Sequence, residues 1–163
     1  MGYCGLMVDV SELDLGTLAL FVGQAAAEEV QRALEHGGFG DLRFSQGYLM
    51  QHLIDAEPTV GDLAARLDIT QQGASKAIAE LERGGYAERV GDPVDLRIRR
   101  VRLTGRGRAV VEASPAARRR LEERLAECHG AGRVAAARVL LAEILDGLGG
   151  AEAVGRRDVR PPA

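Results

Sequence analysis

The chain is poor in aromatic residues, cysteine and lysine, and each scarcity excludes something. Aromatic residues make up 4% of its 163 residues, which leaves no stacking platform for single-stranded RNA. Two cysteines, Cys4 and Cys128, do not make a disulfide framework. Lys76 is the only lysine, so arginine supplies almost all of the positive charge. Alanine, leucine and arginine are abundant instead, and this composition favours helices.

Signatures of enzymes and membrane proteins are also missing. The sequence has no glycine-rich phosphate loop, nucleophile elbow or metalloprotease helix, so we expect neither catalysis nor a cofactor. The apolar run 13–27 looks like a signal-peptide core, but Asp9, Glu12 and Asp14 stand where basic residues should be. The run is also too short to cross a bilayer. We therefore expect a cytoplasmic protein without a membrane partner.

Two short helices are predicted over residues 59–83. In the first, apolar residues recur at i, i+3, i+4 and i+7 from Val60, and Thr59 begins a capping box. In the second, Thr70 is the expected cap and the glycines after Arg83 end the helix. The apolar stripe of this second helix consists of Ala74, Ile78 and Leu81.

The opposite face of the second helix is polar, and its residue types suit a DNA groove. Glutamine matches the major-groove edge of adenine, lysine donates to guanine, and serine reaches a base or a phosphate. Any solvated surface helix shows a similar polar face, so the face alone does not decide. The candidate base contacts are Gln71, Gln72, Ser75 and Lys76, and the candidate phosphate contacts are Thr70 and Arg83.

A charged hairpin follows, in which the strand-like runs 86–90 and 99–103 flank a loop with glycine, proline and aspartate. Asp95 and Arg97 stand two apart near its tip, where the carboxylate can orient the guanidinium by a charge-assisted hydrogen bond. An arginine on a thin loop can enter a narrow minor groove. We interpret the hairpin as a wing and expect double-stranded DNA as the partner.

Charge is distributed unevenly along the chain. Its formal net charge is −3, yet residues 59–108 carry ten Lys and Arg against seven Asp and Glu, whereas residues 1–58 carry two against nine. A local basic patch attracts phosphate whatever the net charge of the molecule. An acidic total therefore does not exclude DNA binding by the winged segment.

This segment resembles the winged helix-turn-helix of the MarR family of bacterial transcriptional regulators. The matching stretches are TVGDLAARL (59–67), ITQQGASKAIAELERGGY (69–86), GDPVDLR (91–97) and VRLTGRGRAV (101–110). The resemblance implies a homodimer that binds a pseudo-palindromic operator and usually represses transcription. It also implies a helical dimerisation region built from both chain ends, with effectors held between that region and the winged domain. Leu96 departs from the many members that carry a polar residue there.

The remaining sequence predicts further helices. We expect one over Leu13–Leu34, a shorter one over Phe44–Ile54 capped by Ser45, and a long one from Thr104 that is interrupted or bent around Pro115. After Gly130 a final helix carries a coiled-coil-like seam, which could pack within one chain or against a second. The resemblance favours dimerisation. The seam residues are Val134, Ala137, Leu141, Ile144 and Leu148.

The expected fold class is mainly α with a small β-hairpin wing. We divide the chain into an N-terminal dimerisation helix (1–40), a winged helix-turn-helix DNA-binding domain (41–104), C-terminal dimerisation helices (105–149) and a flexible tail (150–163).

The predicted function is a dimeric, sequence-specific DNA-binding regulator, a repressor that responds to a ligand or signal. One alternative is a winged helix that binds another protein, which would leave the basic wing unexplained. Another is a metal- or thiol-sensing regulator that uses Cys4 or Cys128. Cys128 adjoins His129, but adjacent helical residues point in different directions and no further ligand is nearby. We therefore assign no metal site.

Overall fold

The computed structural model describes residues 9–95 and 97–155. The hypotheses about a redox role for Cys4, about Leu96 and about the tail beyond Gly155 lie outside these residues. The described chain is mainly helical with a two-stranded antiparallel hairpin, in agreement with the sequence. Its elements are η1 (Val10–Glu12), α1 (Leu15–Leu34), η2 (Glu35–Phe39), α2 (Phe44–Gln51), α3 (Val60–Leu67), α4 (Gln71–Arg83), β1 (Ala87–Gly91), β2 (Arg99–Leu103), α5 (Gly105–His129), α6 (Ala131–Gly147) and α7 (Ala151–Gly155).

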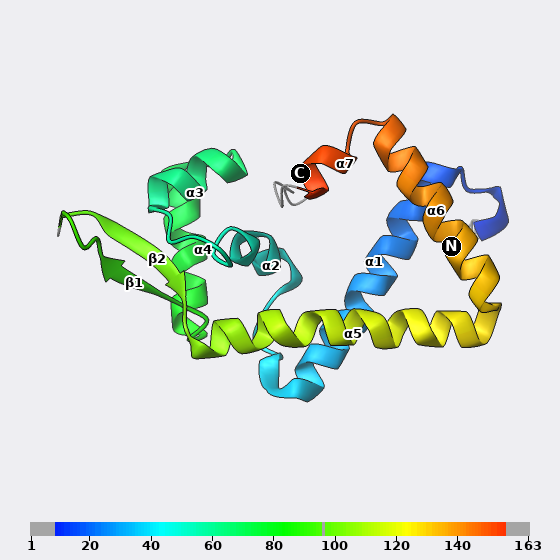
Figure 1. Ribbon diagram of the computed structural model, residues 1–163, viewed down its shortest axis with the longest axis horizontal. Coiled ribbons are helices and arrows are strands. Elements are labelled where there is room, and N and C mark those ends of the chain that lie inside the picture. The colour runs from blue at the N-terminus through cyan, green and yellow to red at the C-terminus, as the bar shows by residue number, and fades with distance from the viewer. Residues whose placement is uncertain (1–8, 96, 156–163) are drawn as a thin grey trace, which may run out of the picture.

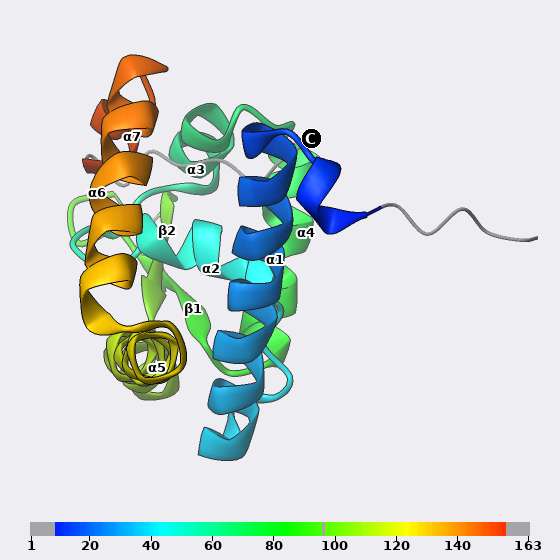
Figure 2. The ribbon, with the colours of Figure 1, turned by 90° about the vertical axis from the view of Figure 1, so that its right-hand side faces the viewer.

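Helix α5 runs along the molecule and joins its two ends (Figure 1). Helices α2, α3 and α4 and the hairpin gather at its N-terminal end, whereas α1 and α6 pack against it farther along. The chain turns from α5 into α6 at Gly130, whose φ of 91° favours glycine. Figure 2 views α5 end-on and shows α1 and α6 standing across its axis.

The core lies at the winged end. The apolar stripes of α3 and α4 face each other and the hairpin, and the fully buried side chains come from these elements and the start of α5. Full burial of a valine, leucine or isoleucine side chain stabilises the fold by about 1.5–3 kcal/mol. The largest of them are Tyr86, Leu63, Ile78, Leu81, Val101 and Val110.

Caps fix the ends of the two central helices as the sequence predicts. The Thr59 hydroxyl accepts the backbone N–H of Asp62 at 3.1 Å, and the Asp62 carboxylate accepts the N–H of Thr59 at 2.9 Å. Thr70 caps α4 by accepting the N–H of Gly73 at 3.0 Å. Gly85 follows α4 in the left-handed region at φ 70°. The start of α4 is therefore set by local interactions.

The predicted start of α2 at Phe44 is confirmed, but the predicted cap and the predicted end were wrong. Arg43, not Ser45, is the N-cap, and the Gln46 side chain reaches back to accept the Arg43 N–H at 2.8 Å. The helix stops at Gln51, three residues before the expected Ile54. Ser45 thus lies inside the first turn, where the glutamine at the third helical position supplies the capping contact.

Pro115 does not interrupt α5. The proline removes a single N–H from the ladder, and the Ser114 hydroxyl one residue earlier donates to the carbonyl of Val110 at 2.8 Å. Helix α5 continues to His129 and packs against α1. The contacts of α5 with β2, α1 and α6 outweigh the cost of one proline.

Candidate nucleic-acid interface

Helix α4 presents its polar face to solvent, next to the hairpin. Ala74, Ile78 and Leu81 are buried beneath the helix. Gln71, Gln72, Lys76 and Arg83 are exposed on the other side, and Thr70 is exposed at the cap. The structure therefore brings five of the predicted contacts together on one accessible surface.

Ser75 differs from these residues because the hairpin holds it. It is half-buried, and the guanidinium of Arg89 on β1 lies 3.4 Å from both its carbonyl oxygen and its Oγ. The same guanidinium donates to the Glu82 carboxylate at 2.5 Å. Sequence analysis missed Arg89. The opposite charges of Glu82 and Arg89 were the available signal, but spacing did not show that this strand faces the helix.

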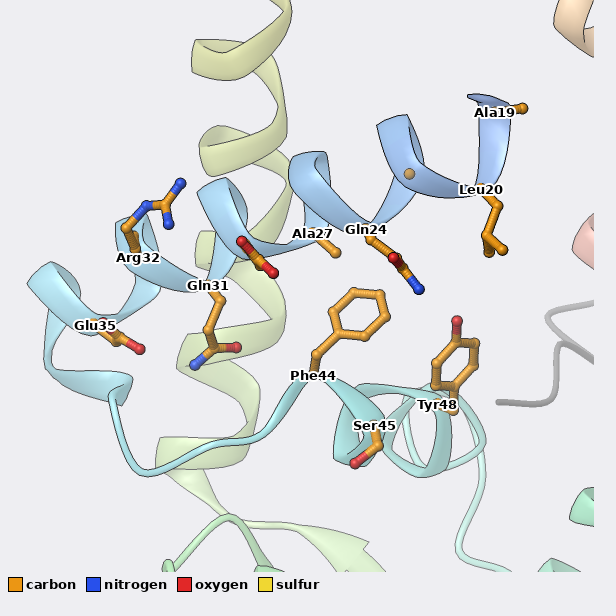
Figure 3. Close-up of a pocket in the computed structure, with 12 residues that line it drawn as sticks. Ala19, Leu20, Gln24, Ala27, Gln31, Arg32, Glu35, Phe44, Ser45 and Tyr48 are labelled. Atoms are coloured by element: carbon orange, nitrogen blue, oxygen red, sulfur yellow. The ribbon is translucent and has the colours of Figure 1, made fainter. Parts of the chain in front are cut away.

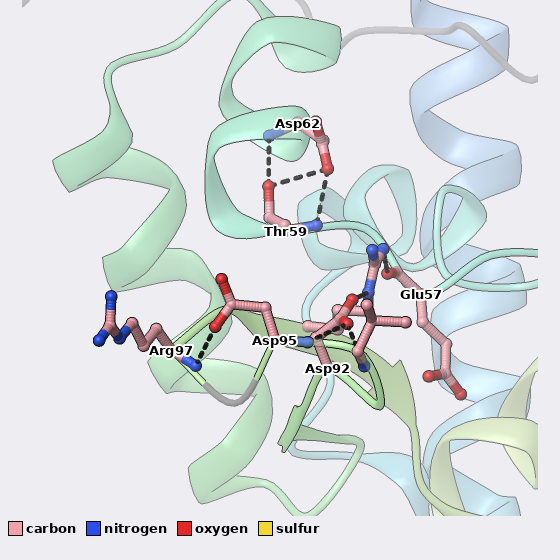
Figure 4. Close-up of polar contacts among 8 residues, drawn as sticks. Glu57, Thr59, Asp62, Asp92, Asp95 and Arg97 are labelled. Atoms are coloured by element: carbon pink, nitrogen blue, oxygen red, sulfur yellow. Dashed lines mark hydrogen bonds and ion pairs between the residues drawn. The ribbon is translucent and has the colours of Figure 1, made fainter.

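The hairpin loop is shaped by Asp92, whose side chain is 5% exposed. Its carboxylate accepts the backbone N–H groups of Val94 at 2.8 Å and Asp95 at 3.0 Å, and it pairs with Arg100 (Figure 4). The two backbone N–H groups, Asp95 first, and then Arg100 lower the pKa of Asp92 from its ordinary value to about 2. A permanent negative charge therefore organises the loop.

Asp95 and Arg97 lie together at the exposed tip, but their contact differs from the predicted one. The Asp95 carboxylate accepts the backbone N–H of Arg97 at 2.9 Å, and the guanidinium extends away from it (Figure 4). An aspartate readily bonds the main chain two residues on, because this closes an Asx turn. Asp95 thus sets the backbone of the tip and leaves the Arg97 side chain directed outward.

The base of the hairpin is anchored to the segment that leads into α3. Arg100 donates to the carbonyl of Glu57 at 3.0 Å, and the N–H of Val101 donates to the carbonyl of Pro58 at 2.9 Å. Thr59 and Arg100 form an isolated antiparallel bridge. The wing and the helix pair are consequently one connected unit (Figure 4).

A cluster around Tyr86 joins this unit to α5. The Tyr86 hydroxyl donates to Asp41 at 2.5 Å, and the Arg106 guanidinium stacks 4.5 Å from the ring centroid. Arg106 also donates to Asp41 at 2.8 Å and to the carbonyl of Gly84 at 2.6 Å. Burial, then the hydrogen bond to Asp41, raises the pKa of Tyr86 to about 12. This cluster ties the end of α4 to the first turn of α5.

A cavity of about 1030 Å³ lies between α1 and α2 (Figure 3). Phe44 and Tyr48 form one wall, with their rings edge to face and their centroids 5.7 Å apart. Both rings point toward α1, from which Leu20, Gln24 and Ala27 face them. Polar and charged side chains continue the wall: Glu28, Gln31, Arg32, Glu35 and Ser45.

Cys128 is an exposed free thiol near the end of α5. Within residues 9–95 and 97–155, no three His, Cys, Asp or Glu side chains are grouped so that they could hold a metal ion. Across the same residues, no helix has the length and apolar character to span a membrane.

A family model described as the MarR family matches residues 41–98, which hold α2, the two central helices and most of the wing. No curated protein matches the chain.

Solved structures share the fold over most of the chain. MepR, a transcription regulator of the Staphylococcus aureus multidrug efflux pump MepA, has 22% sequence identity and a TM-score of 0.65, covering 83% of this chain and 99% of that chain. Apo MarR from E. coli has 24% identity and a TM-score of 0.63, covering 82% and 97%. A MepR mutant bound to an oligodeoxyribonucleotide has 24% identity and a TM-score of 0.57, covering 84% and 99%. MepR bound to ethidium bromide has 23% identity and a TM-score of 0.57, covering 85% and 99%.

Proposed function

Because residues 41–98 match a model of the MarR family, we propose that the chain is a winged helix-turn-helix transcriptional regulator of this family, not an enzyme, that binds a pseudo-palindromic operator as a dimer and represses transcription. The observation that carries the proposal is the exposed polar face of α4 beside a wing whose tip directs Arg97 outward. A helix of this kind fits the major groove, and an outward arginine on a narrow loop fits the adjacent minor groove.

The proposed contacts divide by their chemistry. Gln71, Gln72 and Lys76 read base edges in the major groove, and Ser75 contacts a base or phosphate from the position that Arg89 gives it. Arg97 enters the minor groove, and Asp95 shapes the tip that carries it. Thr70 and Arg83 contact the phosphate backbone, which fixes register without reading sequence.

A second copy of the chain is the proposed partner for the helical end. Exposed apolar side chains line α1 and α6, among them Phe21, Val139 and Leu148. A two-fold dimer that covers them would present two copies of α4 to half-sites about 34 Å apart, one turn of DNA.

The cavity between α1 and α2 is the proposed place for an effector. It lies between α1 and α2, where the N-terminal helix meets the winged unit. A molecule bound there would alter the distance between the two copies of α4 in the dimer. The MepR structures support both parts of the proposal, since one contains an oligodeoxyribonucleotide and another contains ethidium bromide.

A DNA-binding titration tests the proposal. Duplex fragments that the protein selects from its source genome should bind tightly at low salt. Affinity should then fall steeply as salt rises, because each phosphate neutralised adds about −0.9 to the slope of log affinity against log salt. A protein that selects no duplex fragment at low ionic strength, or binds with no salt dependence, is not the proposed regulator. The protein-binding alternative predicts that outcome.

A further inference from the structure

Arg89 connects the wing to two points on α4 that lie seven residues apart. Its Nη1 donates to the Glu82 carboxylate at 2.5 Å, and its Nη2 lies 3.4 Å from both the carbonyl oxygen and the hydroxyl of Ser75. The Arg89 side chain is 30% exposed and that of Glu82 is 28% exposed. One guanidinium on β1 thus has partners seven residues apart on α4.

Helix geometry explains how one group reaches both partners. Ser75 and Glu82 are separated by about two turns, or roughly 10 Å along the axis. Side chains lean toward the N-terminus of a helix and carbonyl groups point toward its C-terminus, so the Glu82 carboxylate and the Ser75 carbonyl approach each other. The planar fork of arginine fits between them, whereas the ammonium of lysine is a point donor. Two attachment points on one helix restrict its rotation against the strand.

The other arginines of the hairpin have different environments. Arg97 and Arg99 are exposed, Arg100 pairs with Asp92 at the base of the loop, and Arg102 donates to Glu88 at 2.9 Å. The side chains of that last pair are 46% and 47% exposed. Arg102 therefore provides a matched control, because it is an arginine on the same hairpin that pairs with a glutamate on β1 and not with one on α4.

We propose that Arg89 is a positioning residue that sets the angle between α4 and the wing. It thereby fixes the register between the major-groove contacts of α4 and the minor-groove contact of Arg97. This inference rests on the proposed DNA-binding function. It assigns a role to Arg89, whose guanidinium contacts Glu82 and Ser75 of the same chain and is not proposed to contact phosphate.

The contact with Ser75 adds a chemical consequence. A guanidinium only donates hydrogen bonds, so the Ser75 oxygen is the acceptor in its contact with Arg89. The hydroxyl hydrogen remains for donation to an acceptor. Ser75 can therefore donate to an acceptor such as N7 or O6 of guanine, O4 of thymine or a phosphate oxygen.

The first experiment needs no DNA. Hydrogen exchange of the β1 and β2 amides is compared in the full chain, Arg89→Met and Arg102→Met. Methionine keeps an unbranched stem and removes the fork. The inference predicts about tenfold less protection in Arg89→Met, equivalent to about 1.4 kcal/mol, and little change in Arg102→Met. Equal protection in Arg89→Met and the full chain would overturn the inference, even if the full chain binds no DNA.

The second experiment measures operator affinity across a salt series. Arg89→Met should bind about tenfold more weakly with an unchanged salt slope, whereas loss of a phosphate contact makes the slope shallower by about one. Arg89→Lys should lie between the two, and Glu82→Gln should weaken binding in the same direction with Arg89 still present. A shallower slope for Arg89→Met, or full affinity, contradicts the positioning role. Failure of the unmodified chain to bind instead contradicts the proposed function.

Discussion

The winged end and the helical end of this chain differ in how completely they bury their apolar side chains. At the winged end Leu63, Ile78 and Leu81 are fully buried. None of the described residues of α6 is buried. Val139 on α6 and Leu148, which follows the helix, are 55% and 81% exposed. The winged end buries its apolar side chains within one chain. The helical end leaves apolar side chains exposed, and only a further surface packed against it would bury them.

The difference follows from the pattern of apolar residues. Helices α3 and α4 each carry one apolar stripe, which a single facing surface covers. Helix α6 carries valine and leucine on several sides, including the consecutive run Val139–Leu141. A helix that is apolar on several sides needs more than one neighbour, and α5 supplies only part of the cover.

The largest expected effect tests the close packing of the winged end. A Cβ added at Gly107 would lie 2.1 Å from the carbonyl oxygen of Tyr86, so Gly107→Ala should lower the free energy of unfolding by about 3 kcal/mol or more. A Cβ added at Gly105 meets nothing within 4 Å. Gly105→Ala, in the first turn of the same helix, is therefore the control. Chemical denaturation gives both values, and equal stability of the two variants would contradict the close approach.

The next effect tests the helical end. Leu141 on α6 and Leu148, which follows the last turn of α6, are exposed and belong to the seam that the sequence predicts. Replacing both with glutamate should weaken self-association by at least about a hundredfold, since two buried leucines contribute about 1.5–3 kcal/mol each. The mass measured by light scattering should fall toward that of one 17.4 kDa chain. Unfolding of the winged end should be unchanged.

A glutamate added elsewhere is the control for this double variant. Ala65→Glu places a glutamate on an exposed position of α3 and should leave the mass unchanged. If the α6 double variant keeps the mass of the unmodified protein, the α6 seam is not the interface.

Most of the secondary structure of the winged end could be predicted from the sequence, because helix caps and apolar stripes depend on residues that are close in the chain. The caps at Thr59 and Thr70 and the stripe of α4 depend on residues three or four apart, and the structure has them as expected. Ser45 was wrongly assigned as the cap because Arg43 takes that position, and Gln46, at the third helical position, accepts its N–H. A residue type that often caps helices therefore does not by itself locate the first turn.

The long-range contacts could not be predicted from one sequence. Arg89 meets Ser75 across 14 residues, and Arg106 meets Asp41 across 65. Their charges were visible, but a chain of many arginines and carboxylates offers numerous possible pairs. At the wing tip the two-residue spacing of Asp95 and Arg97 correctly indicated a contact, although it is made by the main chain rather than the guanidinium.

A smaller effect tests whether the wing acts in binding and not in assembly. Arg97→Ala removes an exposed side chain at the tip, so stability and mass should stay the same. Operator affinity should fall about tenfold, because hydrogen bonds to charged groups contribute about 1.5–3 kcal/mol. Arg133→Ala removes the same charge from exposed α6 and should leave affinity nearly unchanged. Equal affinity of both variants in a gel-shift titration would remove the wing from the mechanism.

The smallest effect concerns the charge of Asp92 inside the wing. Its folded-state pKa is lowered to about 2 from an ordinary value of 3.8, so ionised Asp92 stabilises the folded loop. This contribution is complete above about pH 4 and is lost as the pH falls through about 2. Asp92→Asn should be slightly less stable than the unmodified chain at pH 7, and the difference between their urea midpoints should shrink between pH 4 and pH 2. Other carboxyl groups titrate in both proteins and cancel in that difference. A difference that stays constant over this range would mean that the loop depends on the shape of the Asp92 side chain and not on its charge.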